Sequence, residues 1–263
     1  MTPRLPEADY DQIAAVYDLW ASGDPVSELC WDFYRREVAR RGGVCLEVGV
    51  GTGGVLLGTG KGPGHYYGVD ISSNMISALE KKILRHAPPP FPYTLIHDDI
   101  MRIEAPIPRP SLVIIPFRTI GHFIGSEAKI ALLARLREIC APGAVCLLDH
   151  YKFDLAWAQQ HDRVSRWMAK GRIADETVVL TDTYRYDFPR QEMNCLLGIE
   201  RLAEDGTVTS KRCVSFSFSW LRDDELSALA LAAGWNVQRR WGGFDYAELC
   251  DESSEQIWEF RAA

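Results

Sequence analysis

The chain has 263 residues, of which 47% are hydrophobic and 25% are charged, a composition typical of a folded globular protein and not of a disordered one. Its formal net charge of −7 at pH 7 disfavours nucleic-acid binding, because neutralising phosphates requires a surface rich in Lys and Arg. No apolar run approaches the roughly 20 residues needed to cross a bilayer, and the first residues lack the apolar stretch of a signal peptide, so we expect no membrane partner and a cytoplasmic location.

Seven cysteines are scattered along the chain, without a CxxC pair and without the Cys/His spacing of a zinc site. They are Cys30, Cys45, Cys140, Cys146, Cys195, Cys213 and Cys250. We therefore expect buried, reduced thiols and no metal site built from them.

The N-terminal part of the chain is expected to be helical. Residues 8–41 have helical character, with Asp9 or Asp11 as a possible cap. Gly23-Asp24-Pro25 interrupts this stretch before a second helix from about Ser27 to Arg41. We predict a helical arm over residues 1–43.

From residue 44 to residue 150, apolar strand-like runs alternate with helical patterns. The strand candidates are 44–48, 65–70, 92–97, 111–115 and 144–149, and the clearest helix candidates are 74–86 and 127–140. Strands that alternate with helices predict βαβ units, and hence a parallel sheet covered on both faces.

Beyond residue 150 the pattern changes to long β-branched and aromatic runs. These runs are 176–187, 191–203 and 207–220, and the pair Asp205-Gly206 between two of them is a hairpin signal. We predict a three-stranded antiparallel meander, inserted as a lid over residues 151–221. The rest of the chain, residues 222–263, is expected to complete the core with a helix (223–233) and two strands (235–241 and 256–261).

The most informative segment is the glycine cluster after the first predicted strand, Glu47-Val48-Gly49-Val50-Gly51-Thr52-Gly53. Glycines allow positive φ angles and a close approach of the backbone to a ligand. Gly49, Gly51 and Gly54 also satisfy the GxGxxG spacing, so an NAD-type oxidoreductase is one interpretation. The carboxylate of Glu47 favours another, because it would repel a pyrophosphate but suits a ligand with an ammonium and a sulfonium, unless Glu47 is simply a solvated charge.

Two more acidic residues follow the next predicted strands. Asp70 ends the second strand, where a carboxylate can accept both ribose hydroxyls; alternatively, it caps the helix that begins near Ser72. Asp99 follows the third strand and is placed to accept the adenine amino group, or is an ordinary loop residue.

In order and spacing, these segments resemble the nucleotide-site motifs of class I S-adenosylmethionine (SAM)-dependent methyltransferases. The matching segments are Glu47–Gly53, Gly68–Met75, Asp98–Ile100, Ser111–Phe117 and Leu136–Asp149, which together cover roughly residues 44–150. Glu47 and Val50 depart mildly from the family, which more often has Asp and Cys or Ala there. The resemblance implies an α/β fold with a Rossmann-like, doubly wound sheet of six parallel strands and one antiparallel strand. It also implies SAM as cofactor, S-adenosylhomocysteine (SAH) as product, and no metal.

The resemblance assigns the cofactor residues by position. They are Tyr17, Glu47, Gly49, Gly51, Gly53, Asp70, Ile71, Met75, Asp99, Ile100 and Phe117. Glu47 and the glycine backbone are implied to hold the methionine part and Asp70 the ribose. The adenine is implied to lie between Ile71 and Met75, although apolar residues at this spacing are equally often core residues.

The two ends of the chain resemble small-molecule members of the same family. Asp9–Trp20 is similar to an N-terminal segment that closes over the cofactor, with Tyr10 or Tyr17 at the methionine carboxylate. The predicted lid and Leu148–Tyr151 are similar to glycine N-methyltransferase and to amino-sugar N-methyltransferases of natural-product pathways. The resemblance therefore implies a small-molecule acceptor, with nitrogen slightly favoured over oxygen, and we expect a monomer or homodimer.

Methyl transfer from a sulfonium is an in-line displacement that requires aligned reactants and exclusion of water, and a base only where the nucleophile arrives protonated. His122 and His150 follow the fourth and fifth predicted strands and are candidate bases, with Tyr151 as a third catalytic candidate. Each is alternatively a structural or surface residue. The candidate substrate-binding residues are Tyr10, Trp20 and Arg118, the last through a carboxylate of the substrate or, alternatively, as part of a surface salt bridge. A catalytically silent cofactor-binding subunit is a further alternative.

Overall fold

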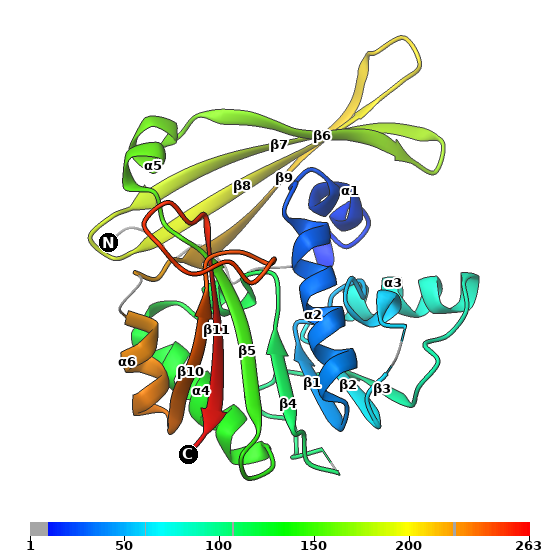
Figure 1. Ribbon diagram of the computed structural model, residues 1–263. Helices are drawn as coiled ribbons and strands as arrows, with labels where there is room; N and C mark the ends of the chain where they lie inside the picture. Colours follow the sequence, from blue (N-terminus) through cyan, green and yellow to red (C-terminus); the bar gives the residue numbers. More distant parts are fainter. Residues whose placement is uncertain (1–9, 61, 107, 223–224) are drawn as a thin grey trace.

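The structure is a computed structural model that describes residues 10–60, 62–106, 108–222 and 225–263 (Figure 1). It contains a seven-stranded sheet in the order β10-β11-β5-β4-β1-β2-β3 and a four-stranded sheet in the order β6-β7-β8-β9. The larger sheet consists of β1 (Val44–Val48), β2 (His65–Asp70), β3 (Tyr93–His97), β4 (Leu112–Ile115), β5 (Val145–Tyr151), β10 (Trp235–Trp241) and β11 (Glu255–Ala262). Only β11 runs against the others, since it pairs antiparallel with both β5 and β10. The predicted sheet of six parallel strands and one antiparallel strand is confirmed.

Helices cover both faces of this sheet (Figure 1). The helices α2 (Ser27–Arg41) and α3 (Ser73–Arg85) contribute to the hydrophobic cluster on one face, and α4 (Gly125–Ile139) and α6 (Glu225–Ala232) to the cluster on the other. Strand β1 is buried on both sides, with Leu46 and Val48 in one cluster and Cys45 in the other. The side chains on both faces of such a strand are shielded from water when the sheet lies between two layers of helices.

A local signal in the sequence fixes the start of α3. The hydroxyl of Ser72 accepts a hydrogen bond from the main-chain N–H of Met75 at 3.1 Å and caps the helix. Ser72, and not Asp70, is therefore the N-cap, and the alternative that Asp70 caps this helix is wrong.

The smaller sheet is antiparallel and has one strand more than predicted. It consists of β6 (Ser165–Ile173), β7 (Glu176–Asp187), β8 (Glu192–Leu202) and β9 (Val208–Ser219). Strand β6 was missed because it mixes charged residues with glycine and buries only Ala169 completely. The helix α5 (Leu155–His161) precedes it and was also not predicted.

The N-terminal arm is less helical than predicted. Its described part consists of the short 3₁₀ helix η1 (Tyr10–Gln12), the helix α1 (Tyr17–Ser22) and then α2, with a break at residues 23–26. The cap candidate Asp9 lies outside the described residues. Asp11 does not cap its own helix but accepts hydrogen bonds from the Ser72 hydroxyl at 2.6 Å and from the main-chain N–H of Asn74 at 2.8 Å, which ties the arm to α3.

The arm also joins the two sheets. A third hydrophobic cluster combines Ile13 and Val16 of the arm with Met75 of α3 and with the inner face of the four-stranded sheet. The contact is close, because a Cβ atom on Gly171 of β6 would lie 2.7 Å from the side chain of Leu19. In Figure 1, α1 lies beneath this sheet, above the ends of β1 and β2.

All seven cysteines are free thiols. Five are buried, as predicted, whereas Cys213 on β9 and Cys250 in the loop before β11 are exposed. Among the described residues, no helix has the length and apolar character required of a transmembrane span.

Candidate functional site

The glycine loop leaves the carboxyl end of β1 in a conformation that requires glycine. Gly49, Gly51 and Gly53 have φ angles of +75°, +53° and +89°, which other residues rarely adopt. The N–H of Gly49 donates to the carbonyl of Val69 at 2.8 Å and so ties the loop to β2. A Cβ atom on Gly49 would also lie 2.9 Å from the side chain of Thr119, so this residue must be small as well as left-handed.

The segment after the loop differs from that of a dinucleotide-binding site. In residues 49–60 and 62–64, the only helix is the three-residue 3₁₀ helix η2 (Leu56–Gly58). A dinucleotide-binding turn instead leads into a long helix whose N-terminus binds the pyrophosphate.

Asp70 connects the glycine loop to α3. Its carboxylate accepts the N–H of Gly51 at 2.7 Å and the N–H of Ser72 at 2.9 Å, one on each oxygen. Burial raises the pKa of Asp70, although these two N–H groups act in the opposite direction. Each oxygen retains a lone pair, so the carboxylate can still accept two hydroxyl groups.

Glu47 is buried and not solvated. Only 2% of its surface is exposed, and its carboxylate accepts a hydrogen bond of 2.6 Å from the hydroxyl of Tyr66 on β2. Burial raises the pKa of Glu47 to about 8. The alternative of a solvated strand-end charge is therefore wrong, and the ionised carboxylate would be stabilised by a nearby cation.

The residues predicted around adenine lie in different environments. Ile71 is 64% exposed, whereas Ile100 is buried. The carboxylate of Asp99 accepts the N–H of Met101 at 2.9 Å. Met75 is packed in the cluster between the arm and the four-stranded sheet, which is the core alternative for this residue.

The turn after β4 carries Phe117 and Arg118. The ring of Phe117 lies 6.1 Å from that of Trp31 on α2. The guanidinium of Arg118 donates to the carboxylates of Asp24 and Glu255, each at 2.8 Å. Arg118 is thus neutralised within the protein by residues distant in the sequence, and the prediction that it binds a substrate carboxylate is corrected.

The arm covers the glycine loop. A Cβ atom on Gly51 would lie 4.0 Å from the ring of Tyr17, which is an ordinary contact. Tyr17 is half-buried, and burial raises the pKa of its hydroxyl. Next to it, Asp18 accepts hydrogen bonds from the hydroxyl of Thr52 and from the ammonium of Lys82, both at 2.7 Å.

Tyr10 and His122 meet where the arm, the core and the four-stranded sheet come together. The hydroxyl of Tyr10 lies 2.6 Å from Nε2 of His122, and Nδ1 of His122 lies 3.4 Å from the carbonyl of Ser217 on β9. Burial lowers the pKa of His122 to about 4, so the ring is neutral. Because a carbonyl oxygen can only accept, the ring proton lies on Nδ1, and Nε2 keeps the lone pair that a base requires.

His150 has a different environment. Its Nδ1 lies 2.9 Å from the carbonyl of Tyr151 and its Nε2 lies 3.1 Å from the carbonyl of Ser219, while burial lowers its pKa to about 4. The neutral ring has a single N–H and can donate to only one of these carbonyls, so the contacts place His150 between β5 and β9. That His150 acts as a base stays a prediction.

The predicted residues Tyr151 and Trp20 lie among aromatic side chains. The hydroxyl of Tyr151 lies 3.5 Å from the sulfur of Met193. The cluster around Tyr151 and Met193 consists of Phe153, Tyr184, Tyr186, Phe188, Phe218 and Trp220. The indole Nε1 of Trp20 is buried without a hydrogen-bond partner among the described residues, so it can donate to a ligand.

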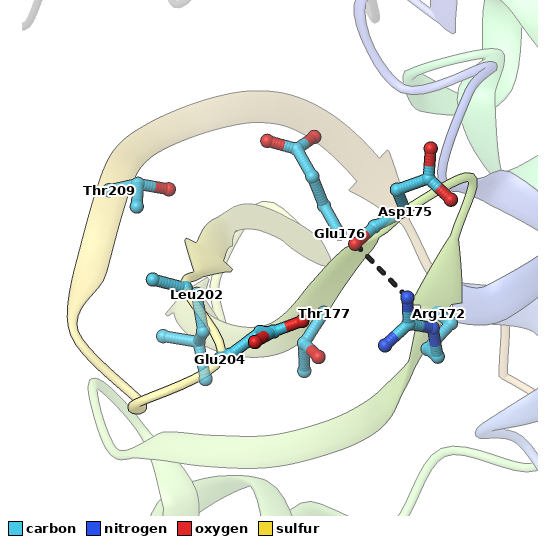
Figure 2. A pocket seen from close by; sticks show the side chains of 8 residues that line it. Arg172, Asp175, Glu176, Thr177, Leu202, Glu204 and Thr209 are labelled. Carbon is cyan, nitrogen blue, oxygen red and sulfur yellow. Dashed lines mark hydrogen bonds between the residues drawn. The ribbon is translucent and has the colours of Figure 1, made fainter.

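One hollow lies beside the glycine loop, and another lies away from the predicted site residues. A groove of about 460 Å³ runs along the glycine loop between the arm, α2 and α3, and is lined among others by Asp24, Trp31, Arg35, Thr52, Gly54 and Lys82. A larger hollow of about 600 Å³ lies at one end of the four-stranded sheet (Figure 2) and is lined by Arg172, Asp175, Glu176, Thr177, Leu202, Ala203, Glu204 and Thr209. None of the predicted site residues lines the larger hollow.

Sequence reasoning missed Trp31, Arg35, Asp149 and Glu255, which lie around the same turn and groove. Asp149 and Glu255 lie in strands, and a buried acid in a strand gives no local motif. In the part of the chain that the structure describes, no three His, Cys, Asp or Glu residues are grouped to hold a metal ion.

Comparison with known proteins agrees with the sequence resemblance. Residues 45–143 match the family model of a methyltransferase domain, and no curated protein matches the chain. The CcbJ methyltransferase from Streptomyces caelestis is 24% identical with a TM-score of 0.76, and the match covers 98% of this chain and 100% of that one.

Two other solved structures are similar over most of their length. DesVI from Streptomyces venezuelae is 20% identical with a TM-score of 0.70, and the match covers 93% of this chain and 97% of that one. CalS10, an amino pentose methyltransferase from Micromonospora echinaspora, is 15% identical with a TM-score of 0.66, and the match covers each chain completely. The predicted fold is confirmed over nearly the whole chain, and the methyltransferase domain over residues 45–143.

Proposed function

We propose, from the methyltransferase domain at residues 45–143, that this protein transfers a methyl group from SAM to a nitrogen or oxygen atom of a small molecule. The observation that carries the proposal is the position of Asp70. It holds the glycine loop and the start of α3 together with one hydrogen bond to each carboxylate oxygen, and it does so near a buried acid, Glu47.

The residues present fit SAM. Glu47 and the glycine loop offer a carboxylate and an open backbone to the methionine part, and Asp70 offers acceptors to the ribose hydroxyls. Ile71, Asp99 and Ile100 flank the same edge of the sheet and would receive the adenine. The buried, unpartnered Nε1 of Trp20 is a donor that a bound ligand would satisfy, because buried polar groups rarely remain unpaired.

When bound, SAM supplies a methyl group activated by its sulfonium. The chain's own residues align the acceptor and exclude water, since the arm and the four-stranded sheet cover the ends of the strands (Figure 1). Nε2 of His122 accepts the proton of an acceptor that arrives protonated. Tyr10, which occupies this nitrogen in the structure, turns its hydroxyl toward the acceptor.

Two observations favour nitrogen as the acceptor atom. Similar structures include an amino pentose methyltransferase and a sugar N-methyltransferase. In addition, Oε2 of Glu255 is buried without a hydrogen-bond partner among the described residues. Tyr151 is paired with Glu255 across β5 and β11, and burial raises the pKa of Glu255 to about 7, so this oxygen is an acceptor that the N–H of an amine would satisfy.

SAH should stabilise the folded protein. A ligand present at 100 times its Kd adds about 2.7 kcal/mol, which raises the melting temperature of a chain of this size by about 5 °C or more. Thermal unfolding with SAH, and with NAD as the control ligand, measures this. A shift with NAD and none with millimolar SAH would contradict the proposal and favour the oxidoreductase.

The affinity for SAM should rise with pH between about 5.5 and 7.5. In the free protein Glu47 is protonated below its pKa of about 8, and binding beside the ammonium of SAM requires the ionised form. The affinity therefore improves as pH rises toward 8, by up to about tenfold per pH unit. Calorimetric titration across this range should show the slope in the natural protein and lose it in Glu47→Gln.

Tyr66→Phe is the matched control for Glu47. It removes the hydrogen bond that favours the ionised carboxylate, so the same slope should appear shifted to higher pH. An affinity of the natural protein that stays constant from pH 5.5 to 7.5 would contradict the role of Glu47.

A further inference from the structure

The turn after β4 has an unusual backbone. Phe117 and Arg118 are consecutive, neither is glycine, and both have left-handed φ angles of +57° and +62°. L side chains rarely adopt this conformation. Something outside the turn must therefore hold it.

The carboxylate of Asp149 holds this turn. It accepts the N–H of Phe117 at 2.8 Å on one oxygen and the N–H of Arg118 at 3.0 Å on the other. Successive N–H groups that converge in this way form a small anion-binding hollow. Asp149 lies on β5, is 1% exposed, and also accepts the hydroxyl of Tyr34 on α2 at 2.7 Å.

The turn after β4 also packs against the glycine loop. Thr119 follows it directly, donates from its hydroxyl to the carbonyl of Pro116 at 2.7 Å, and packs so closely on Gly49 that no Cβ atom fits between them. Phe117 faces Trp31, which lines the groove beside the same loop. A shift of the turn would therefore move one wall of the glycine loop.

We propose that Asp149 is a positioning residue for the cofactor, which acts through the main chain of Phe117 and Arg118 and does not touch the ligand itself. The proposal rests on the proposed function, because it assumes that the glycine loop holds SAM. Tyr34 also donates to this carboxylate from the side of α2. The side chain of Arg118 secures the turn from outside through Asp24 and Glu255.

Asp149→Asn tests this inference with little change in shape. The amide keeps one acceptor oxygen but turns an NH₂ donor toward the second N–H. We expect the Kd for SAH to rise about tenfold, and hydrogen exchange of the amides of residues 117 and 118 to accelerate about 100-fold, with cooperative unfolding retained. Tyr34→Phe is the matched control, because it removes one bond to the same carboxylate but leaves both main-chain contacts. Its affinity should stay within threefold of the natural protein, and its exchange should stay slow.

Thr119→Ser tests the same coupling without altering the buried acid. It keeps the hydroxyl bond to Pro116 and removes the methyl group that rests on Gly49, so the affinity for SAH should fall about threefold. Slow exchange at residues 117 and 118 in Asp149→Asn would overturn the inference, as would unchanged SAH affinity in both Asp149→Asn and Thr119→Ser. If the protein without substitutions does not bind SAH, that result overturns the proposed function, and this inference with it.

Discussion

Replacing Asp70 with alanine is expected to raise the Kd for SAH at least 100-fold. The substitution removes the two oxygens proposed to accept the ribose hydroxyls, and hydrogen bonds to a charged group contribute about 1.5–3 kcal/mol each. It also leaves the N–H groups of Gly51 and Ser72 without their acceptor, so the glycine loop loses its connection to α3. A loss of 100-fold corresponds to about 2.7 kcal/mol, less than the sum of these effects. Calorimetric titration with SAH measures it.

The controls for Asp70 separate loop anchoring from ligand contact. Asp70→Asn keeps one acceptor for a main-chain N–H. Its Kd for SAH should lie between that of Asp70→Ala and that of the natural protein. Asp99→Asn alters a similar acid at the end of the neighbouring strand. We expect the affinity for SAH to fall less than tenfold, because among the described residues the carboxylate of Asp99 contacts Met101 and Arg102 of its own loop. Binding by Asp70→Ala within threefold of the natural protein would refute the ribose assignment.

His122→Gln is expected to lower turnover about 100-fold or more while the affinity for SAH changes less than threefold. A positioned general base contributes about 10²- to 10⁴-fold, and glutamine keeps a polar side chain near Tyr10 without a basic nitrogen. Radiolabelled methyl transfer from SAM to a panel of amino-sugar acceptors measures this. Tyr10→Phe removes the hydroxyl from Nε2 but leaves the base, so its turnover should fall less than that of His122→Gln.

The pH profile provides a second test of His122. A base must be unprotonated to act, and the pKa of His122 is about 4, so its contribution is lost only as pH falls through 4. Between pH 5.5 and 7.5 the rate should follow the ionisation of the acceptor and of Glu47, and not that of His122. Equal turnover by His122→Gln and the natural protein would exclude His122 as the base.

The sequence predicted the elements whose signals are local. Strands β1 to β5 are short apolar runs bounded by polar or glycine residues, and α3 and α4 have clear periodicity, so all were found within a few residues. Strand β6 was missed because it lies at the edge of its sheet and its charged residues and glycine interrupt the apolar run. The domain boundaries predicted at residues 43/44, 150/151 and 221/222 stay predictions.

The site was predictable only where one motif contains the whole feature. The glycine loop and Asp70 are of this kind, since their geometry depends on neighbouring residues and on the adjacent strand. Arg118 was misassigned because its partners, Asp24 and Glu255, are 94 and 137 positions away. The surroundings of His150 could not be predicted for the same reason, because the carbonyl of Ser219 that it faces is 69 residues distant.

The free thiols allow the two sheets to be followed separately. Burial raises the pKa of the five buried thiols (Cys30, Cys45, Cys140, Cys146 and Cys195), so they are poorly reactive toward alkylating reagents at neutral pH. Cys213 and Cys250 are exposed, the first on the four-stranded sheet and the second in the loop that leads into β11. The natural protein can therefore carry one spin label on each part without any substitution, and the interlabel separation would report whether the two parts move relative to each other when a ligand enters.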